Sequence, residues 1–187
     1  MIDDVLGNGR YLGILQPQIS RDNEQASSES PRGKNVELRT IGTLGRLSGF
    51  QETDDGRYII SMTGIVRFRA TDELESDKPY RICGVNYDAF TEDLIGGCGE
   101  EHVDRQKLLT ALKNYLQAKS LEADWQAIEN ASNESLVNSL SMISPYGPEE
   151  KQALLEADDL KARSEVLIAL AEMDLAARDD GYGSAIQ

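Results

Sequence analysis

The sequence predicts an α+β protein, with a β-rich N-terminal lobe over residues 1–98 and a helical lobe over residues 99–187. In the first half, apolar and polar residues alternate, which is the pattern of strands with one buried face. From about residue 100 onward, apolar residues recur every three or four positions, as on the buried face of a helix. The change of period falls at the glycine-rich stretch "GGCGEE", residues 96–101.

The first two strands are expected on either side of a long polar stretch. "RYLGILQP" predicts a short strand that ends at Pro17, and "LRTIGTLGRLSGFQET" predicts a second one. Between them, the segment Ser20–Asn35 is polar and rich in turn residues, so it is predicted to be a mobile loop. Gly42, Gly45 and Gly49 in the second strand favour bulges and strong curvature, as in a small barrel or a Greek key.

The most regular pattern is "ETDDGRYIISMTGIVRFRATDEL", Glu52 to Leu74. It predicts a turn at Gly56, followed by two strands, one through Tyr58, Ile60 and Met62 and the other through Val66 and Phe68. Gly64, between the two strands, marks a tight bend or a bulge. The arginines of "VRFR" are expected on a wet face. Four apolar residues are expected in the sheet core, namely Tyr58, Ile60, Val66 and Phe68. A further strand is predicted in "KPYRICGVNYDAF".

The second half predicts an array of four helices. The first follows an acidic turn and carries a leucine stripe that includes Leu108 and Leu112. The second is "NESLVNSLSMI", and the third begins at Pro148, because proline suits the first helical position. The last is expected from about Asp158 to Ala177, before the frayed tail "RDDGYGSAIQ".

The charge of the chain argues against a nucleic-acid partner. The formal net charge is −14; residues 1–99 carry 11 Lys and Arg against 16 Asp and Glu (−5), and residues 100–187 carry 8 against 17 (−9). A phosphate-binding surface needs clustered Lys and Arg, and the sequence has no such cluster. No apolar run approaches the roughly 20 residues of a membrane-spanning helix, and no signal peptide is evident, so a cytoplasmic protein without a membrane partner is expected.

The sequence contains no recognisable catalytic or metal-binding constellation. Cys98 and His102 invite a metal interpretation, but a second ligand pair is missing, and a glycine-rich hinge with an exposed histidine explains them better. Cys83 and Cys98 do not make a disulfide framework and are expected to be reduced. No phosphate-binding loop ending in Lys-Ser or Lys-Thr occurs, although spacing leaves a distant Ser–Lys pair open. We therefore expect a non-enzyme with no cofactor and no bound metal.

Several segments together resemble the N-terminal, substrate-binding domain of the Lon protease family, in its stand-alone bacterial form. In the first half these are "MIDDVLGNGRYLGILQP", "IGTLGRLSGFQETDDGRYIISMTGIVRFRATDEL" and "PYRICGVNYDAFTEDL". In the helical half the matching segment runs from "DWQAIENASNESL" to "SEVLIALAEM", so the resemblance covers nearly the whole chain. The Gly45-Arg46 step, "DGRY" and "GIVRFR" are its more specific elements.

The resemblance implies a PUA-like β-rich lobe followed by a helical bundle. It also implies a non-catalytic, adaptor-like module that recognises unfolded or tagged polypeptide segments, because the ATPase and peptidase modules of the full proteases lie beyond the matched region. The family-motif positions that the resemblance assigns to an interaction surface are Arg10, Gln16, Pro17, Gly45, Arg46, Gly56, Arg57, Gly64, Arg67, Arg69 and Arg81.

The chain departs from the family pattern at its N-terminus. Family members usually carry an apolar strand with a Phe-Glu-Pro-Arg-like motif before the position that matches Met1. Without that strand, the segment Arg10–Gln16 is expected at an open sheet edge, where a partner strand or a homodimer contact would cover it. An upstream extension is expected to make the protein more stable.

A second hypothesis belongs to a different class of protein. In it, the chain is an enzyme that binds a small molecule or a nucleotide derivative in a cleft between the two lobes. Arg67, Arg69 and Arg81 would then anchor an anionic group, because the guanidinium binds carboxylates and phosphates through two hydrogen bonds.

Overall fold

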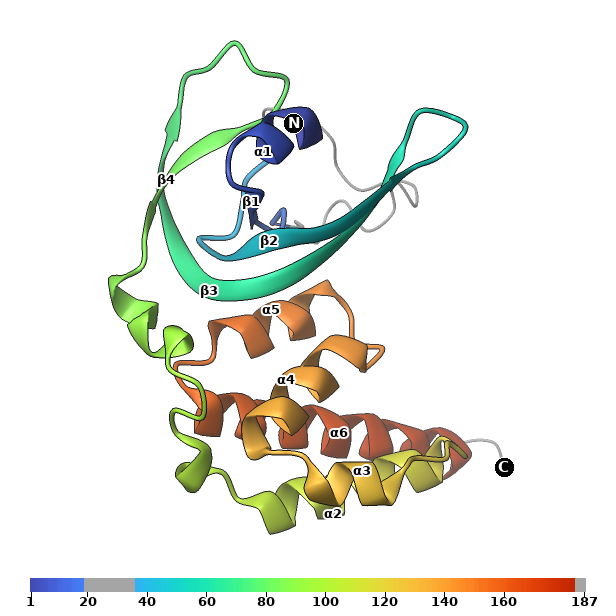
Figure 1. The fold of residues 1–187 in the computed structure, drawn as a ribbon. Helices are drawn as coiled ribbons and strands as arrows, with labels where there is room; N and C mark the ends of the chain where they lie inside the picture. Colours follow the sequence, from blue (N-terminus) through green and yellow to red (C-terminus); the bar gives the residue numbers. More distant parts are fainter. Residues whose placement is uncertain (19–35, 184–187) are drawn as a thin grey trace. The chain divides into compact units, whose positions relative to one another are not determined.

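In a computed structural model, the chain divides into two compact units, Met1–Gly96 and Gly97–Gln187. The structure describes residues 1–18 and 36–183; the predicted loop Ser20–Asn35 and the last four residues lie outside this range. The first unit holds an antiparallel sheet and the second unit is helical (Figure 1), which confirms the α+β class.

The first unit is built on a four-stranded antiparallel sheet whose strands pair in chain order. The strands are β1 (Tyr11–Ile14), β2 (Ile41–Glu52), β3 (Tyr58–Leu74) and β4 (Ile82–Asn86). This order is a meander, so the expected Greek-key order is not found among the described strands. A short helix that the sequence did not predict, α1 (Ile2–Gly7), precedes β1, and a 3-10 segment, η2 (Asp88–Leu94), follows β4.

The central hairpin is formed by β2 and β3. The prediction of two strands within residues 58–69 is wrong, because β3 continues through this region as one strand and its partner is β2. The glycines nevertheless mark bulges, as predicted. Leu44 faces Val66 but Gly45 faces Gly64, and a second shift in register lies between Leu47 and Gly49.

The outer part of this hairpin has only two strands among those described. β1 pairs with β2 no further than Arg46, and β4 pairs with β3 only from Arg69 to Leu74. Residues 49–61, which we call the distal hairpin, therefore extend beyond the strands that cover the rest of the sheet. A two-stranded segment buries less of its side chains than a strand with neighbours on both edges.

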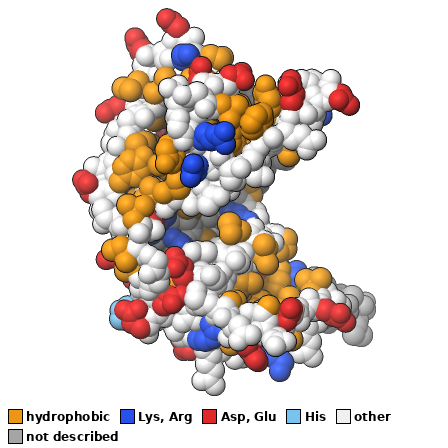
Figure 2. Space-filling model, in the orientation of Figure 1, with side chains coloured by type: hydrophobic (Ala, Val, Ile, Leu, Met, Phe, Trp, Pro, Cys, Tyr) orange, Lys and Arg blue, Asp and Glu red, His pale blue; other side chains and the backbone are white. Residues whose placement is uncertain are grey.

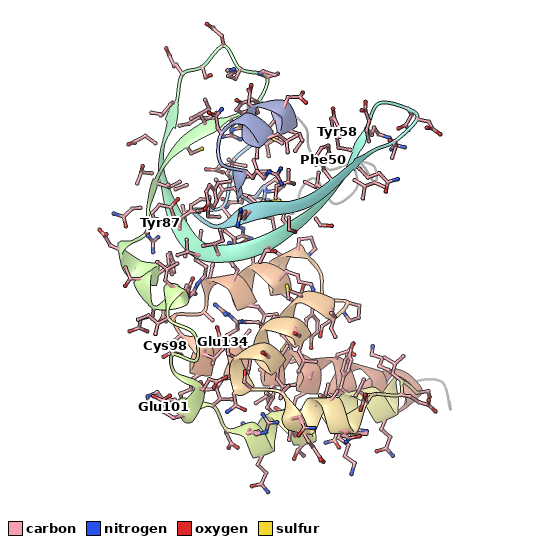
Figure 3. All side chains as sticks on the ribbon, in the orientation of Figure 1. Phe50, Tyr58, Tyr87, Cys98, Glu101 and Glu134 are labelled. Atoms are coloured by element: carbon pink, nitrogen blue, oxygen red, sulfur yellow. The ribbon has the colours of Figure 1, made fainter. Side chains whose placement is uncertain are left out.

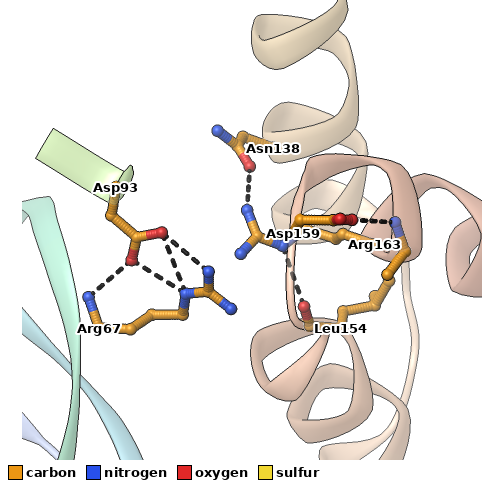
Figure 4. Close-up of polar contacts among 7 residues, drawn as sticks. Arg67, Asp93, Asn138, Leu154, Asp159 and Arg163 are labelled. Carbon is orange, nitrogen blue, oxygen red and sulfur yellow. Dashed lines mark hydrogen bonds and ion pairs between the residues drawn. The ribbon is translucent and has the colours of Figure 1, made fainter. Parts of the chain in front are cut away.

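The core of the first unit includes an arginine. Val66 and Phe68 are buried, as predicted. Arg67 between them is buried as well, and its guanidinium donates to the carboxylate of Asp93 at 2.8 Å (Figure 4). The guanidinium also lies 4.6 Å from the ring centroid of Phe90, and both partners belong to η2. The prediction that Arg67 faces solvent is therefore wrong, because η2 packs over its side chain.

The second unit contains five α-helices in the described chain, one more than predicted. They are α2 (Arg105–Ala118), α3 (Trp125–Asn130), α4 (Asn133–Ile143), α5 (Pro148–Glu156) and α6 (Leu160–Gly183), preceded by the 3-10 turn η3 (Glu100–His102). The additional helix is α3, whose six residues are too few to form a periodic stripe. α5 begins at Pro148, as predicted, whereas α6 continues six residues beyond the expected end.

Side chains cap the N-termini of α2, α3 and α4. The carboxylate of Asp104 accepts a hydrogen bond from the amide of Lys107 and so caps α2. In the last turn of α5, the carbonyl of Leu154 accepts a hydrogen bond from Arg163 at 3.0 Å. Arg163 also donates to Asn138 of α4 at 2.7 Å (Figure 4). The apolar faces form a core around Leu108, Val137 and Leu154. None of the described helices has the length and apolarity needed to cross a membrane.

Candidate functional site

Three exposed apolar side chains share one face of the distal hairpin, and we call them the hairpin patch. Phe50 is 48% exposed, and Tyr58 and Ile60 are each 37% exposed. The prediction that Tyr58 and Ile60 belong to the sheet core is thus wrong. The reason is the length of β2 and β3, which carries these residues past the ends of β1 and β4.

The residues of the hairpin patch lie on one face of the hairpin. Phe50 and Ile60 are directly opposite each other, and Tyr58 is two residues from Ile60, so all three side chains point to the same side. The rings of Phe50 and Tyr58 pack edge to face, with centroids 6.2 Å apart and planes at 64°. Both rings project on the side of the sheet where α1 lies (Figure 3). Ile59, on the opposite face, is 61% exposed.

A turn at the tip fixes the two strands that carry the hairpin patch. Gly56 has a φ of 76°, the left-handed conformation that glycine adopts without strain, as the sequence predicted. The amide of Thr53 donates to the carbonyl of Arg57 at 2.8 Å. Hydrogen bonds from Arg57 and Thr53 lower the pKa of Asp55 to about 2, so this carboxylate is ionised at neutral pH.

Carboxylates lie beside the aromatic part of the hairpin patch. Glu52 is directly opposite Tyr58 on β2, and Asp3 of α1 acts on the same phenol. The negative charges of Asp3 and then Glu52 raise the pKa of Tyr58, because they disfavour a phenolate beside them. Figure 2 shows hydrophobic side chains gathered on this hairpin, next to acidic side chains at its tip.

This arrangement suits binding and offers no reaction chemistry. Apolar surface that leaves water contributes roughly 25 cal/mol per Å², so a partner gains from covering the hairpin patch. Its only titratable side chain is the phenol of Tyr58, which stays protonated at neutral pH. No group of three or more potential metal ligands occurs among the described residues. His102 is exposed in η3, next to Glu101.

Two of the three arginines of the small-molecule hypothesis are paired with carboxylates. Arg67 is bound to Asp93 inside the first unit. Arg81 lies 2.5 Å from a carboxylate oxygen of Glu73, and this contact raises the pKa of the arginine. Arg69 is exposed. An anionic ligand would therefore have to displace a carboxylate from Arg67 or Arg81, which weighs against their use as anchors.

Two other predicted surface positions lie on the hairpin itself. Arg57 is exposed at the tip and forms a salt bridge of 2.6 Å with Asp55. Gly56 precedes it in the turn. These positions are the ones nearest in sequence to the hairpin patch.

The remaining predicted positions belong to the base of the hairpin and to the ends of β1. Gly45 is buried, and a Cβ at this position would lie 2.6 Å from the terminal methyl of Met62. Arg46 is exposed opposite Tyr11. The other predicted positions are Gly64 at the bulge, Arg10 before β1 with a φ of 67°, Gln16, whose carbonyl accepts from Arg39, and Pro17, which bridges to Leu38.

The predicted positions are thus spread over several strands, and sequence reasoning did not select the hairpin patch. The alternation of Tyr58 and Ile60 with polar residues indicated a buried face, and alternation alone does not reveal where neighbouring strands end. The lengths of the predicted strands could have indicated the exposed end of the hairpin. The apolar alternation of β2 and β3 continues to a tight turn, whereas the predicted flanking strands are short.

Comparison with known proteins gives a consistent picture. A protein-family model described as the ATP-dependent protease La (LON) substrate-binding domain matches residues 1–172. A Lon protease from Desulfosudis oleivorans is 25% identical over 170 residues, which is 87% of this chain and 19% of the relative. Lon protease 2 from Myxococcus xanthus is 26% identical over 177 residues, covering 91% of this chain and 20% of the relative. The chain thus spans about a fifth of the length of these relatives.

Two solved structures share the fold. The N-terminal domain of a Mycobacterium avium complex Lon protease superposes with a TM-score of 0.55 at 18% identity, covering 88% of this chain and 90% of that one. A Lon N-terminal domain protein from Xanthomonas campestris gives a TM-score of 0.51 at 18% identity, with 86% and 89% covered.

Proposed function

Because the chain belongs to the family of LON substrate-binding domains, we propose that it binds exposed apolar segments of unfolded or tagged polypeptides. The proposed binding surface is the hairpin patch of Phe50, Tyr58 and Ile60. In this proposal the protein is a non-catalytic, adaptor-like module, and its partner is a polypeptide rather than a nucleic acid.

The observation that carries the proposal is the exposure of adjacent apolar side chains on one face of the distal hairpin. An unfolded polypeptide displays apolar side chains that a folded protein buries. Covering such side chains with the hairpin patch removes apolar surface from water on both partners, so the patch favours unfolded over folded chains. An aromatic pair adds a further contribution, because rings offer a large rigid contact area.

The absence of a reactive group at the hairpin patch supports a binding role. Tyr58 is the only side chain there with an ionisable group, and its raised pKa makes it a poor base at neutral pH. The ion pairs of Arg67 and Arg81 further weaken the small-molecule alternative. We therefore propose recognition without chemistry.

Fluorescence anisotropy with a labelled model protein tests the proposal. The ligand is a reduced and carboxymethylated secretory protein, which stays unfolded in buffer, and the same protein in its oxidised, folded form is the reference. We expect saturable binding of the unfolded form and at least tenfold weaker binding of the folded form. Equal or negligible binding of both forms would overturn the proposal.

A pair of variants places the binding on the hairpin patch. Phe50→Ser combined with Ile60→Ser should weaken binding of the unfolded protein at least tenfold, because each buried side chain contributes about 1–2 kcal/mol and 1.4 kcal/mol corresponds to a factor of ten. Leu74→Ser is the matched control, since Leu74 is 54% exposed at the other end of β3. Equal loss of binding in the control would show that the patch is not the site.

A further inference from the structure

We propose that the hairpin patch selects apolar segments flanked by lysine or arginine over otherwise identical segments flanked by aspartate or glutamate. This inference rests on the proposed function, since it specifies the class of polypeptide that the same surface accepts. The inference is based on the carboxylates that lie beside the hairpin patch.

The first observation is the location of Glu52 and Asp3. Glu52 is the direct cross-strand neighbour of Tyr58, and opposite residues of an antiparallel pair share a face. The carboxylate of Glu52 is therefore on the side of the hairpin patch. Asp3 reaches the same phenol from α1, and the charged groups that act on Tyr58 are both negative.

The second observation concerns the charges that accompany them. The distal hairpin contains one basic residue, Arg57, and three acidic residues, so its formal charge is −2. The acidic residues are Glu52, Asp54 and Asp55. The positive charge of Arg57 is paired with Asp55 at 2.6 Å. Arg46, the next arginine along β2, lies at the base of the hairpin opposite Tyr11. Within the distal hairpin, carboxylates therefore outnumber arginines.

Asp4 differs from Asp3, although it is next to it in α1. Asp4 accepts a hydrogen bond from the hydroxyl of Tyr80 at 2.6 Å and forms an ion pair with Lys78 at 3.2 Å, and these contacts lower its pKa. Its charge is thus compensated within the first unit. Asp3 and Glu52 are the carboxylates that a bound segment would meet at Tyr58.

A bound segment brings its own charges close to these carboxylates. Opposite charges attract and like charges repel, and exposed pairs of this kind change affinity by a few-fold each, so two such pairs give a combined effect of about tenfold at low salt. Exposed charges are screened by salt, with a Debye length of about 3 Å at 1 M. The selection should therefore disappear at high salt, whereas the apolar contribution should persist.

The charge argument also weighs against a second copy of this chain as the occupant. Two copies would bring identical acidic surroundings together, and the net charge of each chain is −14. A basic apolar segment compensates the carboxylates, and another copy does not. Association of the protein with itself would thus appear as an outcome that contradicts the proposal.

Three labelled peptides of equal length test the inference with the complete protein. The first places isoleucine and phenylalanine between lysines, the second places them between glutamates, and the third keeps the lysines but replaces the apolar residues by serine. We expect the first peptide to bind about tenfold more tightly than the second at low salt, with the third weakest. At 1 M NaCl the first two should bind equally.

A charge variant and its control locate the effect. Asp3→Asn with Glu52→Gln should reduce the preference between the first two peptides to within about twofold, since both carboxylates are lost. Glu37→Gln with Asp72→Asn removes two exposed charges of the same unit and should leave the preference unchanged. An unchanged preference in the first variant overturns the inference.

The outcomes separate this inference from the proposed function. If the two apolar peptides bind equally at low salt, the charge selection is wrong and the proposed function stands. If neither apolar peptide binds, the proposed function itself fails. If the serine peptide binds as well as the apolar basic one, binding is purely electrostatic, and the selection of apolar segments is wrong. Concentration-dependent association of the protein with itself, measured by sedimentation and lost in the Phe50→Ser, Ile60→Ser variant, would contradict the choice of occupant.

Discussion

Single residues decide how the distal hairpin is held, and Gly56 is the clearest case. Its φ of 76° lies in the left-handed region, and a Cβ at this position would meet no atom within 4 Å. Glycine is therefore required here by the backbone conformation, and a larger side chain would still have room. Gly64 is different, because its φ is not positive and a Cβ would lie 3.8 Å from the methyl of Thr43, an ordinary contact.

The two glycines give a prediction about stability. Gly56→Ala should lower the free energy of unfolding by about 1 kcal/mol, since a left-handed conformation costs an alanine roughly 1–2 kcal/mol. Gly64→Ala should have a smaller effect or none. Chemical denaturation of both variants and of the unchanged protein measures the difference. An effect at Gly64 as large as that at Gly56 would contradict this account of the turn.

Glu100 makes the stability of the second unit depend on pH. Its side chain accepts a hydrogen bond from the amide of Glu134 at 2.7 Å, near the N-terminus of α4, and this bond lowers the pKa of Glu100 below 4.5. A depressed pKa means that the ionised carboxylate stabilises the folded state above the unfolded pKa. This contribution is lost as the pH falls through the folded pKa.

Glu100→Gln should therefore lower the thermal midpoint at pH 7, and the difference from the unchanged protein should shrink as the pH falls below about 4. Circular dichroism between pH 7 and pH 3 measures both midpoints. Glu101→Gln is the control, because Glu101 is exposed next to His102. A difference that stays constant with pH would show that the carboxylate charge at Glu100 does not stabilise α4.

At the scale of elements, the contact between β3 and η2 depends on a buried ion pair. The side chain of Arg67 is 7% exposed and that of Asp93 is 20% exposed, and Asp93 also accepts a hydrogen bond from the backbone amide of Arg67 at 2.9 Å. The carboxylate thus binds both the side chain and the main chain of one residue. Removing it leaves a buried guanidinium without its charge partner.

Asp93→Ala should destabilise the first unit by about 3 kcal/mol, because an unpaired buried charge costs several kcal/mol. Replacing both partners, as in Arg67→Met with Asp93→Leu, should recover much of this loss, since no charge is then buried. Urea denaturation of Asp93→Ala, of the double variant and of the unchanged protein measures the difference. A double variant less stable than Asp93→Ala would contradict the proposed cause.

Elements long enough to show a regular spacing of apolar residues could be predicted from the sequence, and short helices could not. β2, β4, α2, α4 and the start of α5 follow from alternation, leucine stripes and Pro148. α1 and α3 have six residues each, which is less than two turns and gives no stripe. The burial of Arg67 was missed for a different reason, because it depends on Asp93, 26 residues away along the chain.

The candidate site shows the same limit. The sequence indicated the turn at Gly56 and the alternation that follows it, and these positions form the distal hairpin. It did not indicate that Tyr58 and Ile60 are exposed, because exposure depends on where β1 and β4 stop pairing. Strand ends are set by tertiary pairing, which the pattern of a single segment does not contain.

At the scale of the whole molecule, we propose that the two units are separate folding domains. The main core of the second unit is formed by residues 103–168 and includes Val103, Leu136 and Ile168. A core made within one unit permits folding without the other. The first unit likewise contains its own sheet and the Arg67–Asp93 pair.

Residues 97–187 produced alone should therefore fold cooperatively. We expect helical circular dichroism and a sigmoidal thermal transition, with emission of the single tryptophan, Trp125, changing at the same temperature. The complete chain provides the reference. A fragment that lacks a cooperative transition would show that the second unit needs the first.

The central claim is that the hairpin patch binds unfolded polypeptide, and backbone-amide NMR during a titration tests it most directly. Addition of a reduced, carboxymethylated model protein should cause saturable shifts at Phe50, Tyr58, Ile60 and their cross-strand neighbours, and the Phe50→Ser, Ile60→Ser variant should lose them. The folded form of the same protein should leave these amides unchanged. Saturable shifts confined to β4 or to the second unit, with the distal hairpin unaffected, would contradict the account.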